Sequence, residues 1–296
     1  MAFNTMHSSG NTGCVDFIIV SNRNILMIEK IFREAAAAPD VWSNHHFYVV
    51  YDSEEECKKL KNWVEQAREF MTLPQITTVL AAPENIKNVT ALRAQALQQG
   101  NNPYVYFQDD DDPLPSGLER RMKMMDSHHW QAIYGITKTV SMRGQVIEEF
   151  PTLLQDDFIC EPVKASRIFP TYAHPLAALF KRTLFNKVPL NDGKRYQMSG
   201  SNAFALRLFA SGVQLHFLPD VIRTVRHHAG NNNGILASDE AHKLAMDIDT
   251  WMPLLEDPAV QTFHSNIAKG LKSGTITTYR EIDGHIEAFL EGERFF

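Results

Sequence analysis

The sequence predicts an α/β protein built on a mostly parallel sheet that is flanked by helices, with a helical appendage at the C-terminal end. Short continuous apolar runs, typical of strands covered on both faces, occur at residues 15–20, 46–51, 76–81 and 104–108. Helical patterns separate these runs, from Ile25 to Pro39 and over residues 54–71 and 88–99. Strands that alternate with helices are joined by right-handed crossovers into a parallel sheet.

The pattern is looser in the second half of the chain. It predicts a strand at 131–140 with a return strand at 145–150, a strand running into a short helix at 174–188, a helix at 202–212 and a strand at 213–219. From Ser238 onward the sequence is helical and polar. We therefore expect a flexible N-terminus (1–14), a main domain (15–235) and a C-terminal helical extension (236–296).

Composition excludes several classes of protein. A net charge of −6 argues against a dedicated nucleic-acid binder, although it leaves room for a local basic patch. Three cysteines without CxxC spacing argue against a disulfide framework or a zinc site and favour a reducing compartment. Apolar runs are shorter than the roughly 18 residues of a membrane-spanning helix, and the N-terminus lacks the features of a signal peptide. We expect a soluble, cytoplasmic protein.

Four consecutive aspartates, Asp109 to Asp112, follow the fourth predicted strand. Adjacent carboxylates repel one another, and no run of Lys or Arg lies beside them in the sequence. Ligands of parallel α/β sheets bind at the carboxyl ends of the strands, and a hard divalent cation shared with substrate phosphates would neutralise such a cluster. The motif therefore predicts a Mn²⁺ or Mg²⁺ site; the alternative is a solvated acidic turn before Pro113.

The motifs, in their order and spacing, resemble the family 2 glycosyltransferases, which have the GT-A fold. The resemblance spans residues 15–232 and rests on "FIIVSNRN", "VVYDSEEE", "APENIKNVTALRAQALQQGNNPYVYFQDDDDPLPSGL", "HPLAALFKRTLFNKV" and "ALRLFASGVQLHFLPDVIRTVRHHAGN". It implies a nucleotide-sugar-binding half (15–112) and an acceptor-binding half (113–235). The implied enzyme is a hexosyl- or pentosyltransferase that moves a sugar from a nucleotide-diphosphate sugar to an acceptor hydroxyl. The acceptor would be a saccharide, a lipid-linked glycan, a protein or a modified base.

The resemblance also assigns roles to individual residues. Asp109 matches the first aspartate of the DxD motif, near the ribose or the metal, and Asp111 matches the second, the usual metal ligand. His228, or its neighbour His227, matches a late-loop histidine that can complete the metal shell, and Asp112 matches a further acid that we place among the catalytic residues. The residues implied to contact the nucleotide sugar are Ser21, Asn22, Arg23, Asp52, Asn88, Arg93, Asp109 and Asp110.

Several of these residues have a structural alternative. Asp52 would meet the nucleotide base, but "DSEEE" also opens a helix with acids in its first turn. Arg93 would offer a fork of donors to the diphosphate, or would be a surface helix arginine. The two late histidines would be metal ligands or ordinary loop residues.

One part of the family pattern is absent. Inverting members carry a Glu-Asp pair just before the late helix, and its aspartate is the general base for the acceptor hydroxyl. Aligning "ALRL" at 205–208 places Gly200 and Ser201 at these positions. Three explanations stay open: the register is shifted and Asp192 serves as the base, the enzyme is retaining and the leaving phosphate takes the proton, or the protein binds a sugar nucleotide without rapid turnover.

Two further enzyme classes compete with the leading interpretation. A GT-A nucleotidyltransferase usually carries a Gly-rich, basic loop after the first strand, which "SNRNILM" lacks. An enzyme that glycosylates nucleic-acid bases is compatible with the basic residues Arg120, Arg121 and Lys123, while the negative net charge argues against a nucleic-acid partner.

Overall fold

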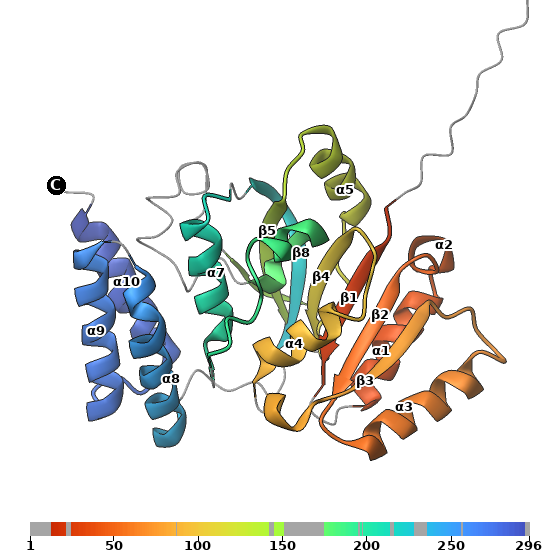
Figure 1. Ribbon diagram of the computed structural model, residues 1–296, viewed down its shortest axis with the longest axis horizontal. Helices are drawn as coiled ribbons and strands as arrows, with labels where there is room; N and C mark the ends of the chain where they lie inside the picture. The colour runs from red at the N-terminus through yellow and green to blue at the C-terminus, as the bar shows by residue number, and fades with distance from the viewer. Residues whose placement is uncertain are drawn as a thin grey trace, which may run out of the picture.

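Eight strands form one mixed sheet in the computed structural model, which describes residues 13–21, 25–86, 88–141, 145–150, 175–194, 196, 198–213, 216–227, 236–255 and 257–293. The strand order is β3-β2-β1-β4-β7-β5-β6, and β8 pairs with β5 (Figure 1). Strands β1 to β4 are mutually parallel where they pair, whereas β7 runs antiparallel between β4 and β5. The strands are β1 (Val15–Val20), β2 (His46–Tyr51), β3 (Gln75–Leu80), β4 (Tyr104–Asp109), β5 (Ala132–Ser141), β6 (Val146–Phe150), β7 (Ala178–Lys181) and β8 (His216–His227).

Within the described residues no helix is long and apolar enough to cross a membrane.

Helices cover both faces of this sheet, as the alternating pattern predicts. The α-helices are α1 (Ile25–Ala36), α2 (Pro39–Trp42), α3 (Glu54–Ala67), α4 (Val89–Leu97), α5 (Leu118–Ser127), α7 (Gly200–Ala210), α8 (Ser238–Trp251), α9 (Pro258–Ser273) and α10 (Tyr279–Glu293).

The central strands are buried on both faces because their apolar runs are continuous. Successive side chains of a strand point to opposite faces. In β1, Phe17 packs in a core that includes Phe32 of α1 and Leu60 of α3. Its neighbour Ile18 packs on the other face, in a core that includes Leu92 of α4. Two helical layers are therefore needed to cover the sheet.

The C-terminal helices belong to the second of these layers. Trp251 of α8, Leu271 of α9 and Ile286 of α10 are buried in the same core as the apolar residues of α4 and α7. Figure 1 shows α8, α9 and α10 side by side at one end of the molecule, next to α7. The expected helical extension is present, and its core is continuous with the core of the sheet.

The largest difference from the sequence-based expectation concerns β8. The sequence predicts a strand at 213–219, whereas β8 extends to His227. Residues 136–141 of β5 pair with residues 221–227 of β8, so backbone hydrogen bonds carry the strand through "VIRTVRH". This extension places Arg223 and Arg226 on a strand rather than in a loop.

A buried histidine links the start of β1 to the turn before β2. His45 is 8% exposed, and its Nδ1 accepts a hydrogen bond from the backbone N–H of Val15 at 3.2 Å. Its ring contacts Phe17 and Trp42 edge to face. Burial lowers the pKa of His45 from 6.5 to about 4, so the folded protein keeps this ring neutral.

We predict that this histidine destabilises the fold in acid. Below pH 6.5 His45 is protonated in the unfolded chain but stays neutral in the folded protein. The contribution of His45 to the free energy of unfolding should therefore be complete above pH 6.5 and should fall by about 2 to 3 kcal/mol as the pH drops towards 4. Urea unfolding of wild type and His45→Asn between pH 4.5 and 7.5 measures this slope. His242→Asn, on the exposed face of α8, is the control. Identical pH slopes for wild type and His45→Asn would contradict the assignment.

Candidate active site

The site lies where β1 and β4 end side by side. Val20, the last residue of β1, pairs with Asp109, the last residue of β4. The residues that follow the two strands, Ser21 and Asp110, therefore lie side by side. Ser21 Oγ donates a hydrogen bond to Asp110 Oδ2 at 2.7 Å. This contact fixes the first part of the aspartate cluster at the carboxyl edge of the parallel strands.

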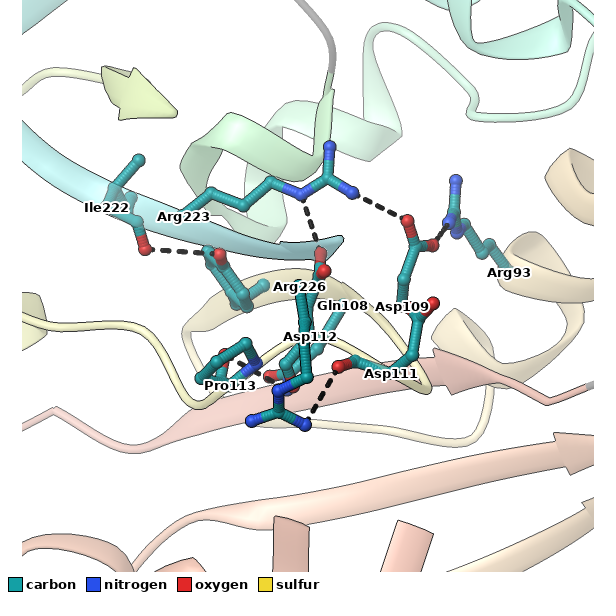
Figure 2. A network of polar contacts seen from close by, with 10 residues as sticks. Arg93, Gln108, Asp109, Asp111, Asp112, Pro113, Ile222, Arg223 and Arg226 are labelled. Carbon is teal, nitrogen blue, oxygen red and sulfur yellow. Dashed lines mark hydrogen bonds and ion pairs between the residues drawn. The ribbon is translucent and has the colours of Figure 1, made fainter. Parts of the chain in front are cut away.

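Two arginines hold the carboxylate of Asp109. Arg93 Nη2 of α4 donates to Asp109 Oδ1 at 2.8 Å, and Arg223 Nη2 of β8 donates to Asp109 Oδ2 at 2.7 Å (Figure 2). Arg93 is buried and Asp109 is half-buried, so both contacts are partly shielded from water. Each oxygen of Asp109 thus has a guanidinium partner from a different element.

Arg223 also binds the last aspartate of the cluster. Its Nε donates to Asp112 Oδ2 at 2.8 Å, and the side chain of Asp112 is only 3% exposed. Burial raises the pKa of Asp112 to about 7, even though the positive charge of Arg223 opposes this shift. For Arg223, burial alone would lower the pKa, but the charges of Asp112 and Asp109 raise it overall. Arg223 is therefore a permanent cation bridging two aspartates.

A third arginine contacts the backbone of the cluster. Arg226 Nη1 donates to the carbonyl oxygen of Asp111 at 3.3 Å (Figure 2), and its Nη2 lies 3.5 Å from Glu34 Oε1 of α1. Arg93 and Arg223 therefore place positive charge beside the carboxylates of Asp109 and Asp112, and Arg226 places it beside the backbone of Asp111. The alternative of a solvated acidic turn is wrong for Asp112, which is buried.

A cavity of about 170 Å³ opens beside this network. Arg93 and Asp109 line it together with Thr90 of α4 and with Gly200 and Ser201, the first residues of α7. The guanidinium of Arg93 lies 6.0 Å from the ring centroid of Phe107, and its buried Nε has no hydrogen-bond partner. A buried N–H without a partner costs free energy, and Arg93 as a whole is only 4% exposed. Arg93 is therefore not the surface arginine of the alternative interpretation.

The first turn of α7 explains why a glutamate is missing at residue 200. Gly200 and Ser201 do face the cavity, as the alignment of "ALRL" predicts. A Cβ on Gly200 would lie 2.3 Å from Thr90 Oγ1, closer than any side chain allows. Glycine therefore permits α7 to approach α4, and this packing leaves no room for a glutamate at residue 200.

A buried acid from the C-terminal extension holds the chain just before α7. Asp247 of α8 accepts hydrogen bonds from the backbone N–H groups of Met198 and Ser199, each at 2.7 Å. Trp251 Nε1 donates to Ser199 Oγ at 3.0 Å. Because Met198 also lines the cavity, α8 positions one of its walls.

Asp192 lies near this cavity but not among its lining residues. Its Oδ2 accepts hydrogen bonds from Arg207 Nη1 of α7 at 2.9 Å and from the hydroxyl of Tyr196 at 3.0 Å. Tyr196 itself lines the cavity, and burial raises the pKa of its hydroxyl. Asp192 is therefore bonded to a residue of the cavity lining without lining the cavity itself.

The remaining predicted site residues have varied surroundings. Asn88 caps α4, because its side-chain oxygen accepts from the N–H of Ala91 at 3.0 Å. Asp52 follows β2 directly, and Ser53 rather than Asp52 occupies the N-cap position of α3. Residues outside the described part of the chain are Asn22, Arg23 and His228; of His227 only the backbone, at the end of β8, is described.

The basic residues that would suit a nucleic-acid partner have acidic partners. Arg121 is fully buried and bonds Asp220 at 2.6 Å, and Arg120 lies 3.4 Å from the same carboxylate. Lys123 pairs with Glu119 at 2.6 Å. These three cations do not form an unpaired basic patch.

The sequence analysis missed Arg223 and Asp247. The signal for Arg223 was a charged residue within the β-branched run "VIRTV", which is unusual for a strand unless a partner compensates the charge. Asp247 lies among the polar residues of an amphipathic helix, and nothing in that pattern marks it as buried.

Comparison with protein-family models and with curated protein sequences finds no match. Solved structures do match. TarS 1-349 of S. aureus in complex with UDP-GlcNAc is similar to this chain with a TM-score of 0.57 and 13% identity, over 84% of this chain and 70% of that chain. The mannosyltransferase PcManGT of Pyrobaculum calidifontis, in complex with GDP-Man and Mn²⁺, has a TM-score of 0.55 and 14% identity, over 95% and 79% of the two chains.

GalNAc-T7 with UDP, GalNAc and Mn²⁺ has a TM-score of 0.57 and 12% identity, over 92% of this chain and 56% of that chain. At such low identity the likeness establishes the fold alone. The chain has the GT-A fold: a mostly parallel α/β sheet flanked by helices, with a C-terminal helical appendage.

Proposed function

We propose that this protein is a glycosyltransferase that moves a sugar from a nucleotide-diphosphate sugar to an acceptor hydroxyl. The observation that carries the proposal is the cavity at the carboxyl end of β4, which Arg93 and Asp109 line together with the first turn of α7. Open α/β sheets bind their ligands at this edge. A buried arginine and a helix N-terminus both favour an anion such as a diphosphate.

The solved structures of the same fold support the donor class. TarS was solved with UDP-GlcNAc and PcManGT with GDP-Man. Arginine guanidinium groups bind phosphate oxygens through paired donors, and Arg93 lines the cavity. We infer that Arg93 contacts the diphosphate and that Ser21 and Asp110, at the end of β1 and after β4, lie on the nucleotide side.

We propose that a divalent cation shared with the substrate binds at Asp109 and Asp111. No three His, Cys, Asp or Glu side chains in the described part of the chain form a metal-binding group. A Mg²⁺ or Mn²⁺ ion shared with phosphates needs only one or two protein carboxylates, and the hard oxygens of Asp109 and Asp111 are of the right kind. When bound, such an ion would screen the charge of the leaving diphosphate. PcManGT and GalNAc-T7 were solved with Mn²⁺.

We propose two alternative groups that could take the proton from the acceptor hydroxyl. Either Asp192 takes the proton as a general base, or the enzyme is retaining and the leaving diphosphate takes it. The contacts of Asp192 with Arg207 and Tyr196 favour an anchoring role for Asp192 and hence the retaining proposal. The acceptor and the cytoplasmic location remain predictions from the sequence.

A second candidate function is sugar-nucleotide binding without transfer. The lining of the cavity by Gly200 and Ser201, where inverting enzymes have two acids, favours it. Donor turnover separates the two functions, since a binding protein leaves the donor intact.

The experiment that tests the proposal is a screen of nucleotide sugars with and without Mn²⁺. UDP-GlcNAc and GDP-Man are the first donors to test. A ligand of the folded state raises the melting temperature by mass action, and release of UDP or GDP reports slow hydrolysis or transfer. A nucleotide sugar that stabilises the protein and is turned over supports the proposal. The absence of any shift across nucleotide sugars would contradict it.

We predict that Asp111→Asn abolishes donor turnover and leaves the fold intact. Removing one of four crowded charges relieves repulsion, so the melting temperature of the ligand-free protein should hold or rise. The matched control is Asp239→Asn, because Asp239 forms an exposed helix ion pair with Lys243 at 2.8 Å, on α8. A large fall in melting temperature for Asp111→Asn, or full turnover, would show that Asp111 is not a site residue.

We also predict that Asp192→Asn costs about 1 to 3 kcal/mol of stability, since it leaves Arg207 without its anionic partner. Urea unfolding measures this loss. Tyr196→Phe removes only the hydroxyl bonded to Asp192 and should cost less. If Asp192→Asn instead keeps its stability while turnover falls by about 10² to 10⁴, the usual contribution of a general base, Asp192 is the base and the anchoring role is wrong.

A further inference from the structure

The arrangement of Arg93 and Arg223 conflicts with the simplest form of metal binding. A divalent cation binds a carboxylate through the same lone pairs that accept hydrogen bonds from a guanidinium. Both oxygens of Asp109 already accept from arginines, at 2.8 and 2.7 Å. A cation beside Asp109 would also be repelled by two positive charges a few ångströms away.

Of the two arginines, Arg223 is better placed to be exchanged. Arg93 lies in the interior with its guanidinium near the ring of Phe107, so it has little room to move. The side chain of Arg223 is 15% exposed, against 5% for Arg93, and reaches the cluster from β8 (Figure 2). It bridges Asp109 and Asp112, so it holds the cluster together in the absence of any ligand.

A nucleoside diphosphate offers these arginines an alternative partner. Phosphate oxygens accept paired guanidinium donors as well as carboxylates do. Arg93 lines the cavity, and its buried Nε has no hydrogen-bond partner. When phosphate oxygens bind beside Arg93, Arg223 can leave Asp109 without becoming unpaired.

We propose that Arg223 is a built-in counter-ion that makes divalent-cation binding at Asp109 and Asp111 depend on the nucleoside diphosphate. In the free protein Arg223 occupies Asp109 and excludes the cation. With the diphosphate present, Arg223 exchanges a carboxylate for phosphate oxygens and exposes Asp109. The proposal rests on the proposed function in that its ligand is the donor diphosphate.

This exchange has a thermodynamic consequence. If the diphosphate raises the affinity for the cation, the cation must raise the affinity for the diphosphate by the same factor. Removing the charge of Arg223 should therefore strengthen binding of the cation alone and weaken the coupling between the two ligands. Both effects are changes in binding affinity, so they can be measured without knowing the acceptor of the sugar.

The test is a titration of Mn²⁺, followed by the electron paramagnetic resonance signal of the free ion, with and without UDP. For wild type we expect weak binding of Mn²⁺ alone and binding at least about 10-fold tighter with UDP, the range of typical coupling. For Arg223→Gln we expect Mn²⁺ alone to bind about 10-fold tighter than to wild type, because the competing charge is gone. Circular dichroism and the melting temperature show whether the variant is folded.

Two variants make the comparison specific. Arg120→Gln removes another arginine that is ion-paired with an aspartate, Asp220, at the surface and away from the cluster; it should bind Mn²⁺ as wild type does. Arg223→Lys keeps the charge but cannot bridge two carboxylates with a planar fork, so its affinity for Mn²⁺ alone should lie between those of wild type and Arg223→Gln. If Arg223→Gln does not fold, the affinity of Arg223→Lys for Mn²⁺ alone still tests the proposal.

The proposal is overturned if wild type binds Mn²⁺ alone as tightly as with UDP, or if neither Arg223 variant differs from Arg120→Gln. Failure of the proposed function has a different signature. In that case UDP and other nucleoside diphosphates do not bind at all, while the titrations with Mn²⁺ alone still report whether Arg223 excludes the cation.

Discussion

The charge balance of the aspartate cluster is the constraint on which the site depends. Asp109 is the last residue of a buried strand, and Asp112, beyond its end, is buried, so the charge of Asp112 needs a cationic partner. Arg223 supplies one charge to both, and removing one partner of a buried ion pair typically costs about 3 to 5 kcal/mol. Arg223 lies on β8, and its pairing with Thr137 of β5 positions this arginine beside the cluster.

The opposite wall of the site depends on close packing rather than on charge. Gly200 lets α7 approach Thr90 of α4, and Asp247 of α8 fixes the two amides before α7. The C-terminal extension therefore takes part in building the cavity, although none of its described residues lines it. The same packing excludes one of the two acids expected there, the one at residue 200.

The sequence predicts most of the fold because each strand and helix leaves a local signal. The continuous run at 15–20 and the helical spacing of Ile28, Ile31 and Phe32 are features of neighbouring residues, and both are confirmed. The site depends on contacts between distant residues. Asp109 is visible as part of a motif, but its partners lie 16 and 114 positions away, so the sequence suggests a metal where the structure has arginines.

A crystal structure of the protein with UDP and Mn²⁺ tests the central claim most directly, because the anomalous signal of manganese locates the ion independently of the protein atoms. The account predicts a manganese peak beside Asp111, phosphate oxygens bonded to Arg93, and Arg223 displaced from Asp109. UDP bound away from Arg93, or Arg223 unchanged on Asp109 with manganese bound elsewhere, would contradict it.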